Sequence, residues 1–132
     1  MALQFEDLEI WKQSRELCQN INKITNYALF DKDFRFRDQI RASSGSIMDN
    51  IAEGFERNGN KEFIQFLYIA KGSCGEVRSQ LYRALDNNLI IKEEFDALYN
   101  KTMHLSKSIS NFIQYLKTSQ ISGHKNLKSL NT

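Results

Sequence analysis

Histidines and paired carboxylates are the side chains in this sequence whose types and spacing could support catalysis. Only two histidines occur, His104 and His124, and no Glu-x-x-His pair of the kind that holds a di-iron centre in helical bundles is present. Asp49 and Glu53 are one helical turn apart and could form a paired-carboxylate site. Because Glu53 also precedes Arg57 by one turn, a surface ion pair is the favoured interpretation. We therefore expect a protein that is not an enzyme and that uses neither a metal nor a cofactor.

Arginines offer a binding chemistry instead, because guanidinium groups pair well with phosphates. Acidic residues are interleaved with them and the net charge of the chain is only +2, so a solvated surface of mixed charge is the alternative for a single chain. In a ring of subunits a modest excess of positive charge is repeated around the axis, which favours phosphate binding. The candidate residues for contacting nucleic acid are Arg35, Arg37, Arg41, Arg78 and Arg83.

The elements that must position these side chains are predicted to be four helices. Hydrophobic residues recur at steps of three and four along residues 6–29, 33–57, 60–87 and 92–118. The chain has no proline and six glycines, a composition that favours long helices over a turn-rich β fold. Helices of similar length with short connections bury their apolar faces most simply as an antiparallel up-down-up-down four-helix bundle. The predicted fold class is therefore all-α.

One domain, residues 1–118, is expected to be followed by a flexible basic tail, residues 119–132. The tail carries Lys125 and Lys128 without an acidic residue, and it lacks a sustained apolar face. No apolar run approaches the length of about 18 residues that a membrane span requires. Cys18 and Cys74 form no CxxC pair, and the N-terminus has acidic residues where a signal peptide has basic ones. We therefore expect a cytoplasmic protein that does not enter the membrane.

Small residues cluster near the middles of the second and third predicted helices, as SSGS at 43–46 and GSCG at 72–75. Glycine in a helix interior lowers helix stability by roughly 1 kcal/mol relative to alanine. Close packing of another helix against the glycine should offset this loss. The favoured hypothesis is that these two helices pack closely against each other, and the alternative is a close contact with another subunit. The residues predicted to make this helix packing are Ser44, Gly45, Ile47, Ile51, Gly72 and Gly75.

Several segments together resemble a known family of bacterial proteins. The stretch SIMDNIAEGFER, residues 46–57, resembles the signature S-I-P-x-N-I-A-E-G, and residues 5–18, 39–41 and 62–81 fit the same pattern in order. This pattern is typical of the four-helix-bundle proteins found in intervening sequences of bacterial large-subunit ribosomal RNA genes. The accessory protein of diversity-generating retroelements is a relative. The resemblance covers residues 5–118.

The resemblance implies a four-helix bundle that assembles as a homopentamer and binds nucleic acid or a partner protein. In the retroelement relative the pentamer binds nucleic acid and a reverse transcriptase through basic surface. The partners implied for this chain are therefore further copies of itself, RNA or DNA, and a reverse transcriptase or other nucleoprotein. A protein-interaction or structural module without a nucleic-acid role is the alternative.

The chain departs from the family pattern at three positions. Met48 stands where the signature has proline, so any kink in the second helix would have to come from Gly45. Ala42 follows Arg41 where the family often has a second arginine, which weakens the basic patch. Ile91 replaces the usual serine before the fourth helix, so a side-chain cap is missing there.

Overall fold

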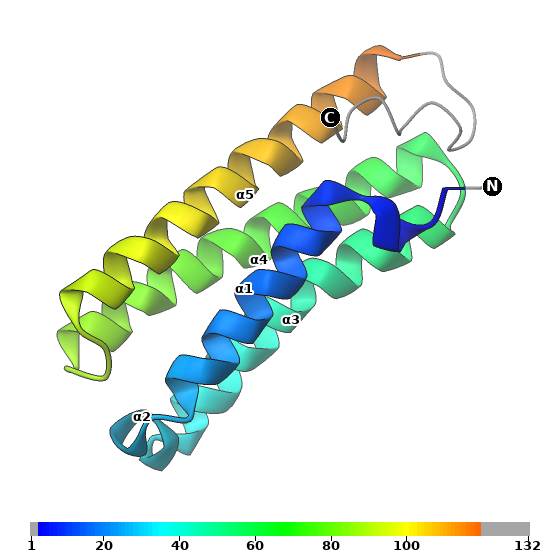
Figure 1. Cartoon of the computed structure of the whole chain (residues 1–132). Coiled ribbons are helices and arrows are strands. Elements are labelled where there is room, and N and C mark those ends of the chain that lie inside the picture. Colours follow the sequence, from blue (N-terminus) through cyan, green and yellow to red (C-terminus); the bar gives the residue numbers. More distant parts are fainter. Residues whose placement is uncertain (1–2, 120–132) are drawn as a thin grey trace.

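The computed structural model describes residues 3–119, and within that range it contains helices and no strand (Figure 1). A short 3-10 helix, Phe5–Asp7, precedes α1 (Glu9–Thr25), α2 (Ala28–Lys32), α3 (Phe34–Glu56), α4 (Asn60–Asp86) and α5 (Lys92–Thr118). The four long helices α1, α3, α4 and α5 run in alternating directions. The predicted all-α, antiparallel up-down-up-down four-helix bundle is therefore confirmed.

The first predicted helix, residues 6–29, is divided in the structure. α1 ends at Thr25, Asn26 and Tyr27 form a turn, and α2 follows as a separate short helix. The turn is held from α3, because Arg41 donates from Nε to the Thr25 hydroxyl over 2.9 Å and from Nη2 to Asn26 Oδ1 over 3.0 Å. Periodicity alone could not show this contact, since it joins residues on different helices.

The short helix α2 closes one end of the bundle with an aromatic side chain. Phe30 is completely buried and stacks on Phe36 of α3, with ring centroids 5.2 Å apart. Asp33 then caps α3 by accepting a hydrogen bond from the backbone N–H of Phe36. Because the first predicted helix is divided, Phe30 of α2 covers the end of the core, which it would not do from a continuous helix.

The start of α5 has a cap that the sequence did not indicate. Ile91 has no polar side chain, but Glu94 reaches back and its Oε1 accepts the backbone N–H of Ile91 over 3.0 Å. This contact is one half of a capping box, and it satisfies an N–H group that the first turn leaves unpaired.

The bundle core is formed by the apolar faces of all four long helices. Contacts are most extensive between α3 and α4, and they are sparser between α1 and α5. Among the predicted packing residues, Ser44, Ile47 and Ile51 are buried in this core. Among residues 3–119, the completely buried aliphatic side chains are Leu8, Ile21, Ile40, Ile47, Ile51, Leu67, Ala70, Val77, Leu81, Ala84 and Ile109.

The serines of the small clusters join the helices through hydrogen bonds. Ser43 accepts from Nε2 of the buried Gln80 on α4 over 3.0 Å, and the hydroxyl of Ser73 on α4 donates to the hydroxyl of Ser46 over 3.0 Å. On the other side, the Cys18 thiol of α1 donates to the backbone carbonyl of Ser44 over 3.1 Å. Small polar side chains thus pair across the middle of the bundle.

The glycines of those clusters behave differently, and the prediction that they pack closely within the chain is wrong. A Cβ placed on Gly45 or Gly72 would meet no atom within 4 Å, and one placed on Gly75 would meet only Nη2 of Arg78, 3.9 Å away on the same helix. The position without room is Gly54, where a Cβ would lie 2.6 Å from Cβ of Phe66. The helices α3 and α4 therefore need a glycine near their junction and not at their middles.

Cys74 is buried between α4 and α5, where its thiol donates to the backbone carbonyl of Thr102 over 3.3 Å. Burial raises the pKa of this thiol to about 11 from 9.0. Burial also raises the pKa of the half-buried Cys18. Both thiols therefore stay protonated at neutral pH, and neither is an activated nucleophile.

Two expectations concern the chain termini and membranes. The predicted basic tail, residues 119–132, lies outside the described residues apart from Ser119. Within residues 3–119, no helix has the length and apolar character needed to cross a membrane.

Gly54 gives the first testable prediction. Gly54→Ala should lower the free energy of unfolding by roughly 1–3 kcal/mol, because the added methyl overlaps Phe66 close to its backbone. Gly72→Ala is the matched control and should keep or raise stability, since its methyl meets open space and alanine favours the helix. Urea unfolding followed by circular dichroism measures both. Equal stability of Gly54→Ala and the parent would contradict the packing described.

Cys74 gives a prediction about pH. Its folded pKa lies above the unfolded value, so its contribution to stability is complete below pH 9.0 and is lost as pH rises to about 11. Over that window the free energy of unfolding of the parent should fall by about 2–3 kcal/mol more than that of a Cys74→Ala variant. This difference is independent of how stable the two proteins are below pH 9.0. Cys18→Ala removes the other thiol, whose pKa burial also raises, so its stability curve is compared over the same window and is not a neutral reference. Parallel stability curves for the parent and Cys74→Ala would show that the buried thiol does not titrate as described.

Candidate nucleic-acid interface

Four of the five predicted arginines gather at one end of the bundle. Arg35, Arg37 and Arg41 lie on the first half of α3, and Arg83 lies near the end of the antiparallel α4. The two helices are joined there by Nη1 of Arg83, which donates to Oε1 of Gln39 over 3.1 Å. We refer to Arg35, Arg37, Arg41 and Arg83 as the arginine cluster.

Two members of the arginine cluster are held by neutral groups. Arg41 is fixed by the hydroxyl of Thr25 and the amide of Asn26, as described for the end of α1. Arg83 is fixed by Gln39, and its guanidinium carbon lies 4.4 Å from the centre of the Phe36 ring. These partners orient the guanidinium groups but bring no negative charge, so the positive charges are not neutralised.

Arg37 differs because its partners are acidic. Its Nη1 lies 2.7 Å from Oδ1 of Asp31, and its Nε lies 3.0 Å from Oδ1 of Asp38. Hydrogen bonds to these two carboxylates raise the pKa of Arg37. The geometry therefore argues against Arg37 as a phosphate contact, because its charge is already compensated. Arg35, by contrast, is exposed and forms no ion pair with any residue from 3 to 119.

The fifth candidate, Arg78, lies away from the arginine cluster. It is one helical turn after Cys74, on the side of α4 that faces α5, and it is half-buried. Its Nη1 is shielded from solvent and has no hydrogen-bond partner among the described residues. The structure thus separates Arg78 from the four arginines with which the sequence analysis grouped it.

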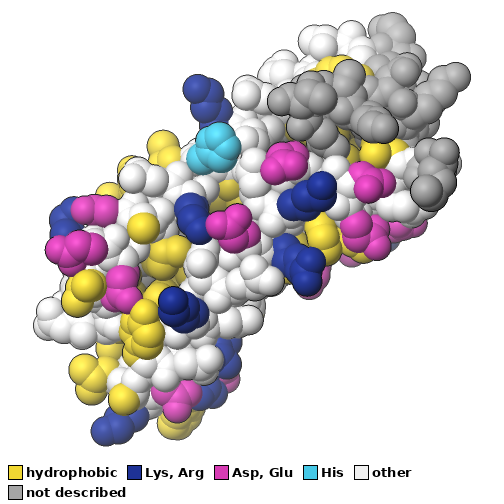
Figure 2. All heavy atoms as spheres, in the orientation of Figure 1, with side chains coloured by type: hydrophobic (Ala, Val, Ile, Leu, Met, Phe, Trp, Pro, Cys, Tyr) yellow, Lys and Arg dark blue, Asp and Glu magenta, His cyan; other side chains and the backbone are white. Residues whose placement is uncertain are grey.

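Large apolar side chains are exposed around α2 and the start of α5, at the end of the bundle where α3 begins and α4 ends. Figure 2 shows hydrophobic side chains at the surface of this end. We call these residues the apolar end patch: Tyr27, Leu29, Phe34 and Ile91. Leu29, Phe34 and Ile91 are each more than 60% exposed, at 61%, 63% and 61%. The Tyr27 hydroxyl donates to Oε2 of Glu94 over 2.6 Å, which ties the turn after α1 to the start of α5. This hydrogen bond raises the pKa of Tyr27.

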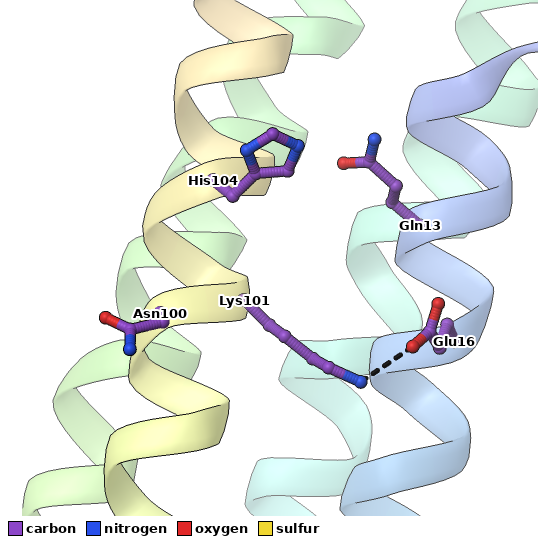
Figure 3. Close-up of a pocket in the computed structure, with 5 residues that line it drawn as sticks. All are labelled: Gln13, Glu16, Asn100, Lys101 and His104. Atoms are coloured by element: carbon purple, nitrogen blue, oxygen red, sulfur yellow. Dashed lines mark hydrogen bonds and ion pairs between the residues drawn. The ribbon is translucent and has the colours of Figure 1, made fainter.

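A groove of about 370 Å³ lies between α1 and α5, the two adjacent long helices with the sparsest contacts (Figure 3). Lys101 crosses it and bonds to Oε1 of Glu16 over 2.6 Å and to Oδ1 of Asn20 over 2.9 Å. His104 and Gln13 face each other across the groove, and Asn100 is a further lining residue on α5. Lys101 and Glu16 thus form an exposed ion pair that joins α5 to α1 across the groove.

The other candidates for chemistry are not brought together either. Glu53 pairs with Arg57, with Oε2 and Nη2 3.0 Å apart, as a surface ion pair would. Within residues 3–119, no group of three or more His, Cys, Asp or Glu side chains lies close enough together to hold a metal ion.

Sequence reasoning missed the neutral residues that hold the arginines. Thr25 and Asn26 lie 16 and 15 residues before Arg41, and Gln39 lies 44 residues before Arg83. No local spacing rule connects positions so far apart, because the contacts form only when helices pack.

Comparisons with known proteins agree with this architecture. The family model described as 23S rRNA-intervening sequence protein matches residues 6–111. A crystal structure at 1.70 Å resolution of a protein with unknown function from the S23 ribosomal protein family, from Bacteroides thetaiotaomicron, superposes with a TM-score of 0.73. The alignment is 24% identical and covers 80% of this chain and 98% of that chain, a likeness that shows the fold. A search of curated proteins finds no match.

Proposed function

The chain belongs to the 23S rRNA-intervening sequence protein family, and from that premise we propose that it is a non-catalytic, oligomeric scaffold. In this proposal a basic surface of the scaffold binds nucleic acid or a nucleoprotein partner, such as a reverse transcriptase, in the cytoplasm. The observation that carries it is the arginine cluster, in which Arg41 and Arg83 are held by neutral groups and Arg35 is unpaired within the described residues.

The contacts of Arg41 and Arg83 leave donors for a phosphate. A guanidinium group has five N–H donors, and the described contacts occupy two on Arg41 and one on Arg83. Because packing already restricts both side chains, less rotamer freedom is lost when they bind a ligand. Their positive charges are uncompensated, so binding to a polyanion would release counterions and weaken as salt rises.

Self-association is supported by the apolar end patch. Three aliphatic or aromatic side chains that are more than 60% exposed at one end of a small bundle form a surface that a second subunit could cover. Assembly through this end would bring the arginine clusters of neighbouring subunits close together and enlarge the basic surface. The number of five subunits comes from the family resemblance.

The second candidate function is a protein-interaction or structural module with no nucleic-acid role. The apolar end patch would support that function without any contribution from the arginine cluster. The two functions differ in whether removal of the arginine charges changes binding.

Nucleic-acid binding is tested by neutralising Arg35 and Arg83 together. An Arg35→Gln/Arg83→Gln variant should bind labelled RNA or DNA more weakly, and the slope of log K against log salt should fall by roughly 0.7–0.9 for each phosphate that the variant no longer neutralises. Fluorescence anisotropy over a salt series measures both quantities. Arg57→Gln is the control, since Arg57 is compensated by Glu53 at the opposite end of α3. A parent protein that binds no nucleic acid at low salt would refute the function, and unchanged binding by the double variant would refute this surface.

Assembly is tested at the apolar end patch. A Leu29→Ser/Phe34→Ser variant should sediment as a smaller particle than the parent while keeping its helix content, because both side chains are exposed in the single chain. Ile69→Ser is the control, since Ile69 is 51% exposed near the middle of α4. A parent that sediments as a single 15.4 kDa chain at micromolar concentration contradicts the oligomer.

A further inference from the structure

A second basic surface follows the line where α4 and α5 meet, on the opposite side of α4 from Gln39 and the arginine cluster. On α4 it occupies residues 68, 71, 75, 78 and 82, whose steps of three and four place them on one helix face without an acidic residue. We call this surface the α4–α5 seam and define it by three cations and three tyrosines: Lys71, Arg78, Lys117, Tyr68, Tyr82 and Tyr99.

Tyrosine rings lie at both ends of the seam. At one end, Nζ of Lys117 lies 2.6 Å from the hydroxyl of Tyr68 and 5.2 Å from the centre of its ring. At the other end, the Tyr82 ring packs on Phe95 and Tyr99 with centroids 4.8 and 6.0 Å away. Tyr68 and Tyr82 are each 48% exposed. Neighbouring side chains therefore hold both rings while about half of each stays in contact with solvent.

Positive charge occupies the middle of the seam. Lys71 and Arg78 are separated by two helical turns, roughly 10 Å along the axis, and Gly75 lies between them. Nη2 of Arg78 lies 3.9 Å from the position of a Cβ on Gly75, so the guanidinium folds back over the glycine. Both cations lower the pKa of the Cys74 thiol against the larger effect of burial, as positive charges near that thiol do.

Within the described residues these two cations lack acidic partners. No ion pair joins Lys71 or Arg78 to a carboxylate of residues 3–119, and Nη1 of Arg78 has no hydrogen-bond partner there. A shielded guanidinium N–H without an acceptor is costly, and a bound anion would satisfy it once the half-buried Arg78 side chain turns toward solvent.

We propose that the α4–α5 seam binds single-stranded nucleic acid, with Lys71 and Arg78 contacting phosphates and Tyr68 and Tyr82 stacking with bases. A cationic path flanked by partly exposed aromatic rings is the combination that single strands recognise, since unpaired bases can stack on rings while phosphates follow the charges. A duplex keeps its bases stacked inside and would use only the charges. This inference rests on the proposed function, because it names the form of nucleic acid that the protein binds. It is argued from the residues of the α4–α5 seam and not from the arginine cluster.

The test compares a labelled oligothymidylate single strand with a duplex of the same length. Lys71→Gln/Arg78→Gln should weaken binding of the single strand well beyond the charge-matched control Lys12→Gln/Arg15→Gln on α1. Tyr82→Leu should weaken single-strand binding on the order of tenfold, with a much smaller effect on the duplex, and Tyr82→Phe should retain it. Tyr68→Leu provides a second ring variant that does not disturb the packing on Phe95.

Each remaining outcome decides between the proposals. Equal single-strand affinity for the seam double variant and its control would overturn the inference, as would an equal loss for single strand and duplex in both tyrosine variants. The inference would also be overturned if an acidic polyglutamate peptide displaced the single strand equally well from the parent and from the Tyr68→Leu and Tyr82→Leu variants. The seam would then recognise charge alone. If Arg35→Gln/Arg83→Gln weakens binding and the seam variants do not, the proposed function stands and only the seam assignment fails.

Discussion

Helix α3 can lie against α4 as it does because Gly54 carries no side chain. The position of a Cβ there is only 2.6 Å from Cβ of Phe66, so any other residue would push the helices apart near their junction. With the two helices this close, Ser46 meets Ser73 and Ser43 meets Gln80 further along. The antiparallel register set at the junction thus continues to the far end of the pair.

That register determines where the basic surface forms. At the far end, Gln39 on α3 meets Arg83 on α4, and Phe36 lies between Arg83 and Phe30 of α2. A shift of one turn in α4 would separate Arg83 from this aromatic pair. The arginine cluster is therefore a consequence of helix packing, although each of its members was visible in the sequence.

The neighbours of each arginine determine whether its positive charge is compensated within the chain. Asp31 and Asp38 form ion pairs with Arg37, so its positive charge is compensated within the chain. Thr25, Asn26 and Gln39 orient Arg41 and Arg83 without compensating them, and this leaves a fixed positive charge for a ligand. Arg78 has a shielded N–H without any partner in the described residues, and it lies on the side of α4 toward α5, away from Arg83 and Gln39.

The sequence by itself determined the all-α bundle, because apolar spacing and the absence of proline are local properties that persist in any packing of the helices. It also predicted that Ser44, Ile47 and Ile51 take part in helix packing, and these residues are buried. The arginines were a separate prediction, as candidates for phosphate contacts. Only the tertiary structure decided that Gly54 is the close contact, while Gly45 and Gly72 face open space and Gly75 meets only the Arg78 side chain of its own helix. Spacing cannot tell which glycine faces a neighbour. The tertiary structure likewise ended α1 at Thr25 and separated Arg78 from the arginine cluster. The physical reason is that these features depend on contacts between residues far apart in the chain, whose geometry is fixed only when the helices pack.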